Sequence, residues 1–110
     1  MANFWTSDIK SLGLTLGNQK PLDIAVRLVA ELIDSNNVVV ASTPEQIITV
    51  PASGQKGISF SIDFSALTDG MYTPVVIISD LNTNAVIAKA TGEKAWIYSK
   101  ILNIVNVTWV

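Results

Sequence analysis

Short runs with an apolar residue at every second position recur along the chain, separated by turn-forming residues. The two clearest alternations run from Leu22 to Leu32 and from Ile58 to Phe64. Because successive side chains of a β-strand point to opposite faces, this periodicity predicts half-buried strands. Further strands are expected at residues 9–16, 38–40, 46–50, 72–80 and 86–91. The pattern predicts an all-β domain with a core that contains Ile58, Phe60, Ile62 and Phe64.

Turn signals set the boundaries of these strands. The run Asp34-Ser35-Asn36-Asn37 favours a hairpin between the alternation that ends near Leu32 and the strand at residues 38–40. Pro44 and Pro51 flank the strand at residues 46–50. Proline cannot donate a ladder hydrogen bond, so both prolines indicate strands at the edge of a sheet.

The last segment, residues 95–110, has a different pattern. Large apolar side chains occupy odd and even positions alike, which predicts an extra apolar strand that is covered on both faces. No charge or proline protects residues 101–110, although exposed sheet edges usually carry such residues. Three occupants of this edge remain open: the chain's own sandwich, an identical chain, or a different surface protein. The predicted protein interface consists of Trp96, Tyr98, Ile101, Ile104, Val105, Val107 and Trp109.

Length and composition narrow the possible functions. The 110 residues fit a single domain, 1–110, with residues 1–8 as an N-terminal arm and 95–110 as the apolar strand. The net charge is −2 and the seven basic residues are scattered, which argues against nucleic-acid binding. Cysteine and histidine are both absent, so disulfides, thiolate zinc sites and the usual general base are excluded.

The carboxylates do not form a recognisable active site. Asp63, Asp69 and Asp80 stand at turns or on the polar side of a strand, and no motif brings a nucleophile, a base and oxyanion donors together. Asp80, Asn82 and Asn84 offer oxygen ligands at alternate positions, as calcium loops do, but with only one carboxylate. We therefore predict no catalytic residues, no metal, no cofactor and no small-molecule substrate.

One segment carries a resemblance to a known fold family. The run Leu67-Thr68-Asp69-Gly70-Met71-Tyr72-Thr73 opens a strand after an apolar strand, and with this pattern residues 9–92 resemble the immunoglobulin-like, fibronectin-type modules of microbial surface proteins. The resemblance implies a β-sandwich of two antiparallel sheets with about seven to nine strands. It also implies that Leu67, Gly70 and Tyr72 form a corner between the sheets. Gly70 would then adopt a positive φ, and the Tyr72 hydroxyl would return to the loop backbone.

These observations favour a non-enzymatic module that mediates protein–protein contact at a cell surface or appendage, for envelope anchoring or self-assembly. Only 15% of residues are charged, which is typical of extracellular, cell-envelope and virion proteins. In size and pattern the chain resembles archaeal envelope components such as the soluble domain of archaellum stator proteins, which contact the surface layer (S-layer). The expected partners are a second copy, foremost as a homodimer, or another envelope protein, with membrane contact only through a segment absent from this chain.

Two alternatives remain. The first is a virion protein of a phage, either a decoration or a tail protein. The second is a carbohydrate-binding module, in which Trp5 or Trp96 would stack on a sugar ring.

Overall fold

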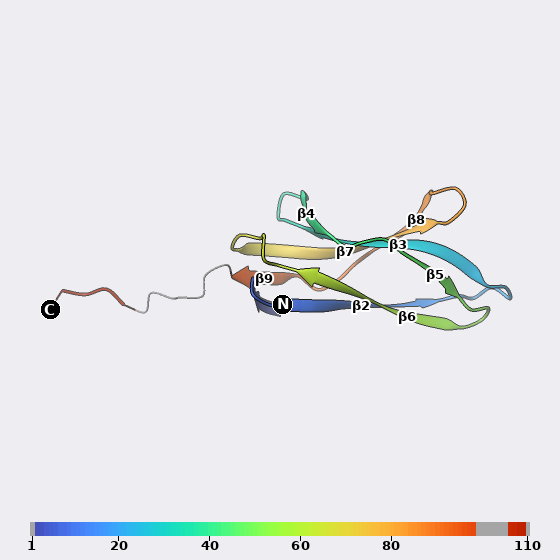
Figure 1. Cartoon of the computed structure of the whole chain (residues 1–110), viewed down its shortest axis with the longest axis horizontal. Helices are drawn as coiled ribbons and strands as arrows, with labels where there is room; N and C mark the ends of the chain where they lie inside the picture. The colour runs from blue at the N-terminus through green and yellow to red at the C-terminus, as the bar shows by residue number, and fades with distance from the viewer. Residues whose placement is uncertain (1, 99–105, 110) are drawn as a thin grey trace.

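The computed structural model of the chain describes residues 2–98 and 106–109 (Figure 1). These residues form nine β-strands and no helix. The strands are β1 (Ala2–Trp5), β2 (Ile9–Gly17), β3 (Ile24–Ile33), β4 (Val39–Ser42), β5 (Gln46–Val50), β6 (Gln55–Asp63), β7 (Gly70–Asp80), β8 (Val86–Thr91) and β9 (Ala95–Tyr98). The all-β class predicted from the alternation is confirmed, and so is each strand expected between residues 9 and 91.

The strands divide unevenly between two sheets. In the larger sheet, β3 and β7 form the central antiparallel pair. On the edge of β3 that faces away from β7, β4 and β5 pair with different parts of the strand. The other edge of β7 pairs with β8 and β9, and β1 pairs with β9. The smaller sheet is the antiparallel pair of β2 and β6, in register from Ile9 opposite Asp63 to Gly17 opposite Gln55. Figure 1 shows this pair as a layer beneath β3 and β7.

The core lies between the two sheets. One cluster of buried residues combines β3 and β7 of the larger sheet with β6 of the smaller one: Val26, Leu28, Ala30, Ile58, Phe60, Val76 and Ile78. A second cluster, near β9, consists of Leu32, Ile62, Phe64, Leu67, Tyr72 and Ile97. Ile58, Phe60, Ile62 and Phe64 are all buried, as the alternation predicted, because every second side chain of β6 faces the larger sheet.

The corner before β7 has the expected tyrosine geometry. Leu67 and Tyr72 are buried, and the Tyr72 hydroxyl donates a 2.6 Å hydrogen bond to the Thr68 carbonyl. The expected reason for Gly70 was wrong, because no glycine in the described part of the chain has a positive φ. A Cβ at Gly70 would instead lie 3.7 Å from the Tyr72 ring, an ordinary contact distance. Positive φ occurs at Asn37, Ser53 and Asn84, all of them in turns.

Three details differ from the sequence-based expectations. The sheets are not fully antiparallel, because β1 runs parallel to β9. Within the segment expected as an N-terminal arm, residues 2–5 form β1. Of the apolar strand expected at 95–110, residues 95–98 form β9, residues 106–109 lie in no strand, and 99–105 and 110 lie outside the described residues. The expected edge strands are confirmed: β4 and β5 each pair with β3 alone among the described strands.

Candidate protein-contact surface

Strand β9 lies inside the larger sheet, and its two edges pair with strands of the same chain. β7 pairs with it on one side, with Gly70 opposite Ile97, and β1 pairs with it on the other. Ala95 and Ile97 point into the core and are buried. Trp96 and Tyr98 alternate with them and therefore face outward. Residues 95–98 are thus paired within the chain on both edges, whereas the unprotected edge expected at 101–110 lies mostly outside the described residues.

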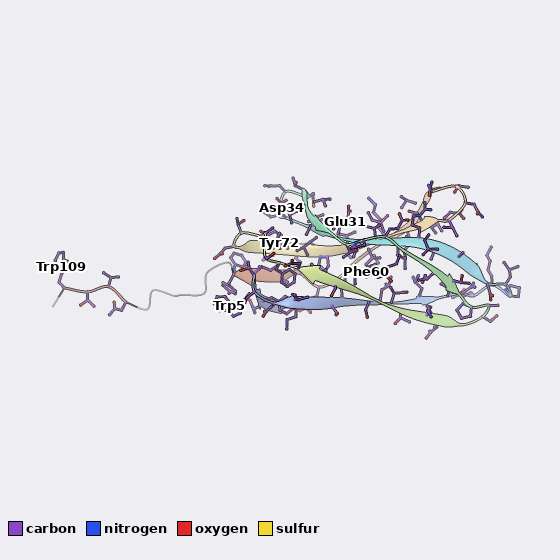
Figure 2. The ribbon with its side chains drawn as sticks, viewed as in Figure 1. Trp5, Glu31, Asp34, Phe60, Tyr72 and Trp109 are labelled. Carbon is purple, nitrogen blue, oxygen red and sulfur yellow. The ribbon has the colours of Figure 1, made fainter. Side chains whose placement is uncertain are left out.

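The outward side chains of β1 and β9 form an aromatic cluster, which we define as Trp5, Trp96 and Tyr98. The parallel register places Trp5 beside Tyr98, with ring centroids 5.4 Å apart and ring planes tilted by 42°. The Trp96 and Tyr98 centroids are 6.2 Å apart, with a tilt of 55°. Trp5 keeps 38% and Tyr98 37% of its surface exposed. Figure 2 shows Trp5 at the end of the sandwich that is nearer to Trp109.

The outward side of the rest of the larger sheet carries apolar residues among charged and polar ones, which include Arg27, Glu31 and Lys89. Val29 lies beside Ile77 at the centre of the sheet, and Ile33 lies beside Val39 nearer its edge. Towards the other end, Ile47 is exposed beside Arg27, which forms a 2.8 Å ion pair with Glu45. We define the apolar outer face as Val29, Ile33, Val39, Ile47, Val75 and Ile77. All these residues take the outward positions of their strands, and Glu31 lies among them, opposite Val75.

The smaller sheet presents the opposite chemistry to solvent. Its outward positions pair Ser11 with Ser61 and Gly13 with Ser59. All four residues are exposed, and none carries a large apolar side chain. The outer face of β2 and β6 is therefore polar at these positions, whereas that of the larger sheet combines the apolar outer face defined above with charged side chains.

The C-terminal part of the predicted interface lies apart from the aromatic cluster. Val107 is 85% exposed, and Trp109, labelled in Figure 2, is as exposed as in an extended chain at 102%. In Figure 1 the segment 106–109 lies away from the sandwich, beyond the end of β9. Ile101, Ile104 and Val105 lie outside the described residues. Of the predicted interface, the structure thus brings Trp96 and Tyr98 together and leaves Val107 and Trp109 exposed elsewhere.

Two of the acidic residues considered as catalytic or calcium-binding groups, Asp63 and Asp80, accept hydrogen bonds from the turns that follow them. The Asp80 Oδ1 atom accepts hydrogen bonds from the backbone N–H groups of Asn82 and Thr83, at 2.8 and 2.9 Å. These two backbone donors hold the pKa of Asp80 below its ordinary value, with Thr83 contributing more. Asp63 Oδ1 likewise accepts a 2.9 Å hydrogen bond from the Ser65 N–H group. No three Cys, His, Asp or Glu residues in the described ranges are grouped as metal ligands.

Sequence reasoning missed two parts of this surface. Trp5 was considered only as a sugar-stacking residue, although its place one residue after Phe4 could have marked it as outward on a strand. The apolar outer face was missed because Val29 and Ile77 occupy positions that alternation assigns to the solvent side. The apolar character of Val29 and Ile77 at solvent-side positions was the sequence signal that could have revealed this face.

No protein-family model matches the chain, and a search of curated proteins found no relative. The described residues also contain no helix long and apolar enough to cross a membrane.

Proposed function

We propose that the chain is a non-enzymatic structural module of a cell surface or appendage whose function is protein–protein contact. The observation that carries the proposal is the aromatic cluster beside the apolar outer face. Tryptophan and tyrosine are enriched at the centres of protein interfaces, where burying them contributes much of the binding energy. Large contiguous apolar surfaces on soluble proteins commonly mark such contacts.

The polar outer face indicates which side of the sandwich would remain in water. Ser11, Ser59 and Ser61 can remain hydrated when the other side of the sandwich meets a partner. A module whose two outer faces differ in apolar content suits a layer or an appendage, in which one side faces a neighbour and the other faces water. The contact would hold the module in its envelope or join it to a second copy, foremost as a homodimer.

The strand pairing supports the proposed kinship with immunoglobulin-like modules. In an immunoglobulin constant-type domain, strands A, B, E and D form one sheet and C, F and G form the other. Here β2 pairs with β6, as B pairs with E, while β3, β7 and β9 follow one another in the larger sheet, as C, F and G do. The Tyr72 corner at the start of β7 also matches the tyrosine corner at the start of strand F.

The proposed setting is extracellular or in the cell envelope, in the class of archaeal components that contact a surface layer. It rests on the low fraction of charged residues, 15%, and on a polar surface built from serine, threonine and asparagine. A decoration or tail protein of a virion is the alternative setting, and it would use the same contact.

The test is the absolute mass of the chain by light scattering after size-exclusion chromatography, over a wide concentration range. We expect a multiple of 11.8 kDa for the natural sequence. Tyr98→Lys should reduce that mass, because it places a charge in the aromatic cluster. Ser61→Lys is the matched control, an exposed strand position on the polar outer face, and should leave the mass unchanged. A monomer at every concentration would contradict self-assembly and direct the search to another envelope protein.

Carbohydrate binding is the second candidate, favoured by the grouping of Trp5 with Trp96 and Tyr98. Aromatic rings that lie together can stack on successive sugars, but ring tilts of 42° and 55° give an uneven platform that suits a protein surface better. The test is quenching of tryptophan fluorescence by cell-wall sugars in a Trp109→Phe background, which removes the emission of the distant Trp109. Quenching that Trp5→Ala abolishes would support glycan binding.

A further inference from the structure

The two strands of the smaller sheet are unequally covered. The inward residues of β6, Ile58, Phe60 and Ile62, are buried. The inward leucines of β2, Leu12, Leu14 and Leu16, are only half-buried although they contact the same core. On β8 of the larger sheet, Ala88 pairs with Ile78 and Ala90 with Val76, so both alanines are on the side of the sheet that faces the core. Even so, Ala88 is exposed and Ala90 is only half-buried. Figure 1 shows β8 rising away from the layer of β2 and β6. The core-facing side of the larger sheet is thus wider than the two-stranded smaller sheet, and the part near β8 is not covered by β2.

The outer edges of the two strands also differ. On the β6 edge, the Gln46 side chain reaches across from β5 and its Nε2 donates a 2.9 Å hydrogen bond to the Ser59 carbonyl. The edge of β2 away from β6 pairs with no strand of the described chain. Apart from Lys10 near its start, β2 has neither charge nor proline to discourage pairing. A nine-residue edge of this kind is a template for another strand.

Two cavities lie along the same side of β2. One, of about 160 Å³, is lined by Leu12 of β2 and by Phe4 and Ala95 of β1 and β9, across the gap between the sheets. The other, of about 420 Å³, is lined by Leu16 of β2 and by Ile87 and Ala88 of β8. The first cavity is also lined by Ile62 and Phe64 and by the charged Lys10 and Glu93, and the second by Ile24 and Val50 and by Asn18 and Lys20. Both reach β2 from beneath the larger sheet. We call this mainly apolar space beside β2, where a third strand of the smaller sheet would lie, the β2 slot.

We propose that the C-terminal segment of a second copy of this chain fills the β2 slot by adding a strand to the free edge of β2. The inference deepens the proposed contact function by naming the partner and the acceptor site. It uses a surface separate from the aromatic cluster.

The sequence of the segment suits this slot. Val107 and Trp109 alternate with Asn106 and Thr108, the pattern of a strand with one apolar and one polar face. The two-residue spacing equals that of the leucines on β2, so the apolar pair would enter the slot beside them. Asn106 and Thr108 would then continue the polar outer face next to Ser11 and its neighbours. Residues 101–110 contain no charged side chain, so the added strand would bring none into the slot, whose own lining includes Lys10, Lys20 and Glu93.

The position of the segment points to another copy as the acceptor. Residues 106–109 lie beyond the end of β9, away from the slot of their own sandwich, and Val107 and Trp109 are exposed. The chain thus carries a donor and an acceptor at different places on its surface. A contact between such unlike surfaces repeats head to tail, giving a ring when the rotation closes and a filament when it does not.

The test uses the absence of cysteine from the chain, so that each introduced thiol is the only one in its molecule. Chains carrying Thr108→Cys are mixed with chains carrying Ser11→Cys or Thr15→Cys and are oxidised gently. Neighbouring strands bring side chains of the same face within reach of a disulfide. Ser59→Cys is the matched control, because it lies on the same polar outer face but one strand further from the slot. We expect mixed disulfide dimers with a β2 variant and few with Ser59→Cys.

A second measurement checks the energetics by light scattering. Val107→Lys should weaken self-association by at least about tenfold, since it removes an apolar side chain that the slot of the second copy would bury and introduces a charge there. Ala88→Lys should do the same from the acceptor side. Ala88 is exposed in the isolated chain, so its replacement leaves the fold intact.

Three results would overturn the inference. One is that Thr108→Cys cross-links as efficiently with Ser59→Cys as with the β2 variants, or that it cross-links with neither. Another concerns a double variant that carries both Thr15→Cys and Thr108→Cys. If its disulfide forms only within a single chain, the segment that fills the slot is the chain's own. The third is self-association that Tyr98→Lys abolishes while Val107→Lys and Ala88→Lys leave it intact; the contact function would then stand and strand addition would fail.

Discussion

Strands β2 and β6 have the same length, the same alternation and a shared register, yet they differ in how much of their apolar surface is buried. Leu14 is half-buried, whereas Ile58, its direct partner across the ladder, is buried. The difference comes from their other neighbours. β6 lies against the core, with Gln46 of β5 bonded across its outer edge, while β2 has an open slot at its outer edge. Burial therefore depends on the completeness of the surrounding sheet as much as on the strand's own sequence.

The largest expected effect lies on the β6 side. Phe60 is almost fully buried in the cluster that joins the two sheets. Phe60→Ala should lower the free energy of unfolding by about 3–5 kcal/mol, because it removes the transfer free energy of the ring and leaves a cavity. Urea unfolding followed by circular dichroism measures this change. A loss as small as that of an exposed side chain would contradict the placement of β6 in the core.

The partners Ile58 and Leu14 give the direct test of the comparison. Ile58→Ala should cost about 2–4 kcal/mol, as for a buried residue, and Leu14→Ala only about 1–2 kcal/mol, because part of the Leu14 surface is already in water. The volume-conserving Leu14→Met is the control and should cost less than either. Equal losses at the two positions in a dilute, monomeric sample would show that β2 is covered as completely as β6.

The protected edge of β6 gives a smaller effect. Gln46→Glu keeps the shape of the side chain but removes the Nε2 donor to the Ser59 carbonyl. We expect a loss of about 0.5–1.5 kcal/mol in the free energy of unfolding, the usual contribution of one hydrogen bond. Gln46→Asn, which shortens the side chain and keeps an amide donor, is the comparison variant. An unchanged stability for Gln46→Glu would mean that this bond does not protect the edge.

The sequence predicted the strands well and their environment less well. Alternation at Ile58, Phe60, Ile62 and Phe64 identifies a core strand, because period-2 burial is a local property. It cannot identify which strand lacks a neighbour, since β2 and β6 alternate alike. The parallel pairing of β1 with β9 was also beyond local reasoning, because it joins residues more than ninety positions apart in the sequence.

The candidate surface was predicted in part for the same reason. Trp96 and Tyr98 were recognised because they stand in a conspicuously apolar segment, and the structure adds Trp5 from the other end of the chain. The β2 slot involves Leu16 and Ala88, neither of which is unusual in sequence. Only the three-dimensional arrangement shows that, among the nine described strands, none lies over the free edge of β2.

The smallest expected effect is at the end of β6 and depends on pH. The Ser65 backbone N–H group hydrogen-bonds to the exposed Asp63 carboxylate and holds its pKa below the ordinary value of 3.8. Because the folded-state pKa is the lower one, this contribution to stability is complete above the unfolded pKa and is lost as the pH falls through the folded pKa. Stability should thus decline slightly below about pH 4. Asp63→Asn, which keeps an acceptor oxygen but does not titrate, should show a shallower acid decline in thermal unfolding. Identical pH profiles for the two proteins would show that the turn after β6 holds without this charged acceptor, so the difference between β6 and β2 would rest on core burial and the Gln46 bond alone.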